Sequence, residues 1–203
     1  MTVRAVFFDV GETLVDEERY WRAHAAVVGI PPHVVWAALG VTIARGEEHT
    51  EVWRRLGVER PSPSIPYVLD DLYPDALESL ARLRAAGLFV GIAGNQSAAM
   101  EEWGRESLPA DMVASSASLG VRKPDPRFFE RLVDLAGTPA EEVAYVGDRA
   151  DNDAAPAVEA GLVAFHLRRG PWGRLQETPD GAIAVDSLTE VSAVLTRAPV
   201  ADA

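Results

Sequence analysis

The chain has no cysteine among its 203 residues, and lysine is almost as rare. A disulfide-stabilised scaffold, a thiolate metal site and a cysteine nucleophile are therefore excluded. Lysine and arginine together number 19, and every one except Lys123 is arginine. The single lysine is either an accident of composition or marks a place that a compact ammonium fills and a planar guanidinium does not.

Long hydrophobic runs are also absent. A membrane-spanning helix needs about 20 apolar residues, and the best candidate, residues 25–44, is interrupted by two prolines and a histidine at 31–33. Near the N-terminus only Arg4 precedes a short apolar stretch that ends at Asp9, so no signal peptide is expected. These features predict a cytoplasmic protein that has no membrane partner.

Basic residues are fewer than acidic residues. The chain carries 31 acidic and 19 basic residues, for a net charge of -12, and it has no basic block. We therefore expect no nucleic-acid partner. The composition, 48% hydrophobic and 25% charged, excludes a disordered or fibrous chain. The length allows one substantial core and at most one small further domain, and it leaves the oligomeric state open.

Short apolar segments alternate with amphipathic helical segments along most of the chain. The segments expected to form strands are 3–8, 88–93, 112–115, 142–147, 162–167 and 182–185. Helices are expected at 74–86, at 126–136 and after Ser187, which has capping-box spacing to Glu190. This alternation predicts an α/β fold with a parallel, Rossmann-like sheet that helices cover on both faces.

Residues 16–72 interrupt the alternation. They contain three helical patterns, at 17–28, 32–45 and 47–56, and then a proline-rich linker at 61–66. We therefore expect an all-helical insert at 16–72, directly after the first strand. Residues 1–15 and 73–203 would form the α/β core domain.

Polar side chains follow the first four predicted strands. Asp9 comes after the first, Asn95 after the second, Lys123 after the third and Asp148 after the fourth. Because ligands bind at the carboxyl ends of parallel strands, these side chains should share one crevice. Clustered carboxylates repel one another, so they need either a cation, for which Mg²⁺ is suited, or raised pKa values. A carboxylate can also act as a nucleophile. Taken singly, each residue is more often a turn or capping residue, but their joint order favours a catalytic site.

Four segments carry recognisable motifs. They are Phe-Phe-Asp-Val-Gly-Glu-Thr-Leu at 7–14, Ile-Ala-Gly-Asn at 92–95, Arg-Lys-Pro-Asp-Pro at 122–126 and Gly-Asp-Arg-Ala-Asp-Asn-Asp at 147–153. In these motifs and in the position of the helical insert, the chain resembles the haloacid dehalogenase-like (HAD) superfamily of hydrolases. The resemblance covers nearly the whole chain and implies that the insert is the family's small helical cap.

The resemblance also implies roles for individual residues at a metal site. Asp9 would be the nucleophile and a Mg²⁺ ligand. The backbone carbonyl of Gly11 and the side chain of Asp148 would be further ligands, and Asp153 would support the metal.

A second group of residues is implied to bind the phosphate. Lys123 would neutralise both the nucleophile and the transferring phosphoryl group. Thr13, Gly94 and Asn95 would line the phosphate site.

Three positions depart from the family's pattern. The family's phosphatases carry a second aspartate, the general acid and base, where this chain has Gly11, and a serine or threonine where it has Gly94. Glu12 stands where glycine is usual, and it is either a substitute acid and base or, on the simpler interpretation, a surface residue in a turn. Acid–base assistance is typically worth about 10²–10⁴-fold, so phosphatase turnover is expected to be weak.

These observations predict a Mg²⁺-dependent HAD-like hydrolase, a phosphatase for a small phosphorylated metabolite that acts through an aspartyl-phosphate on Asp9. The alternative is a catalytically weakened HAD-fold protein that binds or regulates. A haloacid dehalogenase is disfavoured because such enzymes need no metal, whereas this chain keeps Asp148 and Asp153. A phosphonate-cleaving enzyme is rejected because residues 16–72 contain no lysine that could form its Schiff base.

Overall fold

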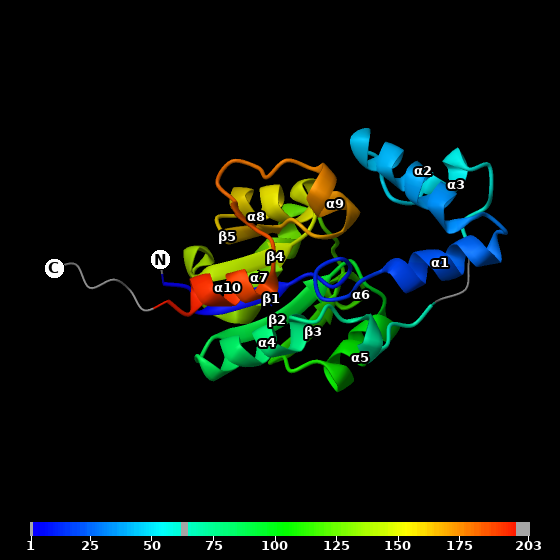
Figure 1. Ribbon diagram of the computed structural model, residues 1–203. Helices are drawn as coiled ribbons and strands as arrows, with labels where there is room; N and C mark the ends of the chain where they lie inside the picture. Colours follow the sequence, from blue (N-terminus) through cyan, green and yellow to red (C-terminus); the bar gives the residue numbers. More distant parts are fainter. Residues whose placement is uncertain (1, 62–64, 198–203) are drawn as a thin grey trace.

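The computed structural model describes residues 2–61 and 65–197, and a six-stranded parallel sheet lies at its centre (Figure 1). The strand order is β3-β2-β1-β4-β5-β6. The chain passes from β1 outward to β2 and β3, and then returns to the other side of β1 with β4. Such a reversal leaves a crevice at the carboxyl ends of the strands. The strands are β1 Ala5–Phe8, β2 Phe89–Gly94, β3 Met112–Ser115, β4 Val143–Gly147, β5 Val163–Leu167 and β6 Ile183–Val185.

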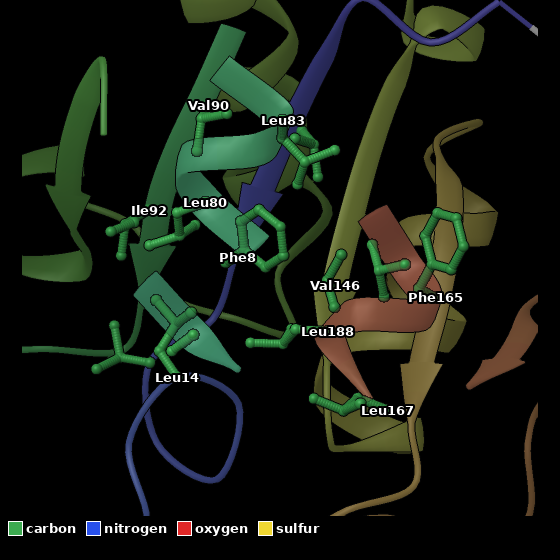
Figure 2. Packing of buried hydrophobic residues seen from close by; sticks show 14 of the residues in the cluster. Phe8, Leu14, Leu80, Leu83, Val90, Ile92, Val146, Phe165, Leu167 and Leu188 are labelled. Atoms are coloured by element: carbon green, nitrogen blue, oxygen red, sulfur yellow. The ribbon is translucent and has the colours of Figure 1, made fainter. Parts of the chain in front are cut away.

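The sheet is buried on both faces, because successive side chains of a strand point in opposite directions. In β1, Val6 and Phe8 belong to one hydrophobic cluster, whereas Ala5 and Phe7 belong to another. Figure 2 shows Phe8 among aliphatic side chains from neighbouring strands and from a covering helix, including Leu80. The near-continuous apolar character of the strands follows from this two-sided burial.

Helices cover each face of the sheet. Side chains of α4, α5 and α10 pack on the face of Phe8, and those of α7 and α8 pack on the opposite face. The helices that follow the insert in the chain are α4 Ala76–Ala85, α5 Ala98–Ser107, α6 Ser116–Leu119, α7 Pro126–Ala136, α8 Ala155–Glu159, α9 Gly170–Leu175 and α10 Leu188–Leu195.

The insert contains α1 (Glu18–Val27), α2 (Pro32–Ala44) and α3 (Glu51–Arg55), which lie at the end of the molecule remote from α10 (Figure 1). These helices share a hydrophobic cluster of their own, which Trp172 of α9 joins from the core. The two connections of the insert to the core pair with each other through an antiparallel bridge between Val15 and Leu72. α1 and α2 reach the length and hydropathy of a membrane span only as a pair, and the chain bends by 112° between them.

The predicted sheet, its two helical faces and the helical segment after the first strand are confirmed. α7 has the predicted bounds, and the Ser187 side chain accepts from the Glu190 amide at the start of α10. No range was predicted for α5, α6, α8 or α9. Part of the predicted linker lies outside the described residues, and the domain division at 16–72 stays a prediction.

Candidate active site

A cavity of about 1140 Å³ lies at the carboxyl ends of the central strands. Asp9 directly follows β1, Asn95 follows β2 and Asp148 follows β4, and all three residues line it. Residues of the insert line it as well, including Trp21 and His49. The cavity is therefore the crevice predicted from the strand order, and the helical insert contributes to its walls.

Lys123 is buried beneath this cavity between two carboxylates. Its Nζ lies 2.8 Å from Oδ1 of Asp9 and 2.5 Å from Oδ1 of Asp153. The ring centroids of Tyr145 and Phe128 lie 5.3 and 6.0 Å from the same nitrogen. Burial opposes the charged form of Lys123, but the charges of Asp153 and Asp9 prevail and hold its pKa well above the usual value. Lys123 therefore stays an ammonium and offsets the charge of Asp9.

Asn95 holds the backbone of Lys123 in place. Its Oδ1 accepts from the Lys123 amide at 2.8 Å, and its Nδ2 donates to the Lys123 carbonyl at 2.9 Å. Asn95 thus positions the lysine, a role that the sequence did not suggest. Its predicted contact with phosphate stays a prediction, for which one N–H of the amide is left.

Three buried carboxylates form a candidate metal centre. Asp9, Asp148 and Asp153 each offer one oxygen, and these oxygens lie within 4.8 Å of one another. Burial raises the pKa of Asp9 and, more strongly, that of Asp148, and the charge of Asp153 raises both further. One ammonium does not balance three carboxylates, so a bound cation would relieve the excess negative charge. The all-oxygen donor set fits Mg²⁺.

The loop after β4 is shaped around Asp153. A methyl group built on Gly147 would lie 2.3 Å from Oδ2 of Asp153, so the carboxylate packs directly against the glycine. The Arg149 amide donates to the same oxygen at 3.0 Å. On the other side of the loop, a ring nitrogen of His166 lies 3.0 Å from the Asp148 carbonyl. These contacts fix the turn that presents Asp148 to the cavity.

Four motifs thus meet at one end of a parallel sheet, and a family model for haloacid dehalogenase-like hydrolases matches residues 3–161. The chain belongs to this family. The match spans the strands that carry Asp9, Asn95 and Asp148, and the helical insert between the first two of these strands.

Relatives of this HAD-like chain include phosphatases and dehalogenases. It is 30% identical to a glyceraldehyde 3-phosphate phosphatase of Methanocaldococcus jannaschii over 126 residues, which are 59% of this chain and 54% of that one. It is 29% identical to a phosphoglycolate phosphatase of Rhodospirillum rubrum over 178 residues, 84% of this chain and 72% of that one. The chain spans about half the length of the first of these. A dehalogenase crystal structure, 22% identical, shares the fold with a TM-score of 0.69 over 97% of this chain and 98% of that chain.

Thr13 and Gly94, two of the predicted phosphate-site residues, are both closely packed. The Thr13 hydroxyl is buried and has no hydrogen-bond partner among the described residues, although Thr13 does not line the cavity. A methyl group built on Gly94 would lie 2.3 Å from Oδ1 of Asp9. A side chain at position 94 would therefore displace Asp9 from the orientation in which it meets Lys123.

Glu12 is not a surface residue, so the simpler interpretation of it is wrong. Its side chain is buried, Oε2 accepts from the Tyr73 hydroxyl at 2.6 Å, and the carboxylate packs against the α-carbon of Gly170. Burial, and next the charge of Glu17, raises the pKa of Glu12 to about 8. Its φ of +52° explains why glycine suits this position.

Cationic residues of the cavity wall were missed at the sequence level. Arg60, Arg122 and Arg149 line the cavity beside His49. Burial, and next the charges of these three guanidinium groups, lowers the pKa of His49 to about 4. The histidine is therefore neutral, and the arginines supply the positive charge of this wall. Sequence reasoning missed them because eighteen arginines are scattered along the chain and only the fold selects three.

We expect Asp148→Asn to abolish Mg²⁺ binding and to stabilise the metal-free protein. Folding raises the pKa of Asp148, so the metal-free parent loses stability as the pH rises through that value, and the amide removes this loss. A gain of 1 kcal/mol would raise the Tm by about 2–4 °C. Calorimetric titration with Mg²⁺ and thermal melts at several pH values test this, with the exposed Asp134→Asn as the control. Unchanged Mg²⁺ affinity would remove Asp148 from the site.

Proposed function

We propose that the protein is a Mg²⁺-dependent phosphatase that hydrolyses a small phosphorylated metabolite through an aspartyl-phosphate on Asp9. The observation that carries this proposal is the pairing of Asp9 with the buried Lys123 beside two further carboxylates, at the floor of a cavity. The similarity to phosphatases supports the choice of substrate class.

The side chains have separate tasks in this reaction. Asp9 would attack phosphorus with one carboxylate oxygen, while Lys123 holds that carboxylate in place and offsets its charge. Asp9, Asp148 and the Gly11 carbonyl would hold Mg²⁺, with Asp153 in support. When bound, the metal would neutralise charge on the transferring phosphoryl group. Water would then release phosphate from Asp9 and regenerate the carboxylate.

The cavity wall suggests which phosphate esters fit. Its arginines lie on the insert and on the loops that precede α7 and follow β4. Arg149 is already paired with Asp151 at 2.7 Å, whereas Arg60 and Arg122 make no ion pair among the described residues. We propose that these two guanidinium groups bind a second anionic group of the substrate, such as a carboxylate.

A panel of phosphate esters and 2-haloacids, assayed with Mg²⁺ and with chelator, tests the proposal. We expect Mg²⁺-dependent phosphate release that is fastest for esters with a second anionic group. Arg122→Ala should raise KM for these esters by about 10-fold, the worth of one hydrogen bond to a charged group, and should leave neutral esters unaffected. Arg82→Ala, on the exposed face of α4, is the control of equal charge.

The other outcomes identify the alternatives. Release of halide without a metal would make the protein a dehalogenase. No turnover of either substrate class, with retained binding of phosphate esters, would make it a binding protein on a hydrolase fold.

A further inference from the structure

The proposed reaction needs a group that donates and accepts a proton, and the position two residues after Asp9 cannot supply it. Expulsion of an alkoxide from phosphorus requires a proton for the leaving oxygen, and attack by water requires a base. Gly11 has no side chain. The group must come from elsewhere in the cavity wall.

Most acidic side chains near Asp9 are already engaged. Asp153 is fully buried against Lys123, and Asp148 belongs to the candidate metal centre. Glu12 is held by the Tyr73 hydroxyl and wedged against Gly170. Glu17 also lines the cavity and also accepts from a tyrosine hydroxyl, that of Tyr67. Unlike Glu12, it packs against Gly11, two residues after Asp9.

Glu17 occupies the space that a side chain at position 11 would take. A methyl group built on Gly11 would lie 2.6 Å from Oε1 and 3.0 Å from Cδ of Glu17. The Tyr67 hydroxyl donates to the same Oε1 at 2.5 Å and fixes the carboxyl there. The Glu17 carboxyl, at the start of α1, thus lies where a side chain at position 11 would otherwise lie.

We infer that Glu17 is the catalytic carboxyl that exchanges protons with the leaving group and with the hydrolytic water. This inference rests on the proposed phosphatase function. It assigns Glu17 to direct contact with the reacting oxygens, and it assigns Tyr67 to the positioning of Glu17.

The protons balance over the two half-reactions. In the first, an oxygen of Asp9 bonds to phosphorus, the bond between phosphorus and the leaving oxygen breaks, and the Glu17 proton passes to that oxygen to give the alcohol. In the second, water bonds to phosphorus while its proton passes to the Glu17 carboxylate, and the bond between phosphorus and Asp9 breaks. Inorganic phosphate leaves, and both carboxyl groups return to their starting states.

Glu17→Gln tests the inference when compared on an alkyl and an aryl phosphate. An aryl oxide leaves without a proton, so the variant should release one aryl alcohol per enzyme in a burst, and aspartyl-phosphate should accumulate. Alkyl phosphate should show no burst, and its kcat should fall by about 10²–10⁴-fold. The matched control is Glu18→Gln, because Glu18 is exposed and paired with Arg22. It should behave like the parent.

A rescue experiment separates chemistry from folding. In Glu17→Ala the space beside Gly11 is vacant, so adding Gly11→Asp should restore a carboxyl there and recover alkyl phosphate turnover. Gly11→Asp alone should not help, because it collides with Glu17. Thermal melts check that each variant is folded.

Two results would overturn the inference. One is alkyl phosphate turnover at the parental rate in Glu17→Gln. The other is a folded Glu17→Gln variant that loses both substrates without accumulating phosphoenzyme and is not rescued by the paired substitution. A parent protein that never forms phosphoenzyme would instead refute the proposed function.

Discussion

Lys123→Arg is expected to damage the protein as severely as Lys123→Ala. The ammonium is fully buried, lies 2.8 Å from Asp9 and 2.5 Å from Asp153, and is flanked by the rings of Tyr145 and Phe128. A guanidinium is wider and planar, and it cannot meet both carboxylates from the place of one nitrogen atom. Removal of one partner from a buried ion pair costs about 3–5 kcal/mol.

The activity of both lysine variants should fall together with their stability. The loss of one charged stabilising group near the transferring phosphoryl group costs about 10²–10³-fold in kcat. Denaturant titration and phosphate release assays measure the two effects, with the exposed Arg127→Lys as a control for arginine–lysine exchange. If Lys123→Arg retained parental stability and activity, the single lysine would be an accident of composition.

The sequence was sufficient to predict that Asp9 and Asp148 lie together at the strand ends. Asp9 and Asp148 directly follow strands, and parallel strands end at one edge, so their proximity follows from local pattern and topology. Lys123 was predicted from its motif and its rarity. Its two ion pairs and its hydrogen bonds with Asn95 could be identified only from the structure. They depend on how the loop before α7 returns to the sheet.

The position of Glu17 beside Gly11 could not be predicted from the sequence. Glu17 stands in the acidic run 16–18, whose three members look alike in sequence. Glu17 is held in place by the hydroxyl of Tyr67, which lies fifty positions later in the sequence. The Glu17 carboxylate fits there because Gly11 has no side chain. Such a contact depends on the path of both connections between the insert and the core, which no local pattern records.

Glu12 illustrates a different kind of error. A glutamate next to a glycine resembles an exposed turn, and turns are usually exposed. Here the turn is covered by Tyr73 and by the start of α9, a helix that the sequence did not predict. Gly170 lies where any side chain would collide with the Glu12 carboxylate, so the two positions are matched to each other. The burial of Glu12 therefore depends on a helix that the sequence did not predict.

Asp9→Asn should produce the largest loss of activity of any substitution in this chain. The amide keeps the shape of the side chain and can still accept from Lys123, which retains its pair with Asp153. It cannot form an aspartyl-phosphate, however. Loss of a covalent nucleophile lowers kcat by about 10⁴-fold or more. Because burial raises the pKa of Asp9, a neutral amide is well tolerated, and the variant should fold at least as stably as the parent.

Acid-quenched reactions and binding measurements test whether Asp9 is the nucleophile. Acid-quenched reactions with a phosphate ester should yield a phosphorylated parent and no phosphorylated Asp9→Asn protein, whatever the leaving group. Asp9→Asn should still bind a phosphate ester in equilibrium measurements, because Lys123 and the arginines of the cavity wall remain. A folded Asp9→Asn protein that hydrolyses phosphate esters at the parental rate would exclude Asp9 as the nucleophile. The geometry that joins it to Lys123 would then serve binding alone.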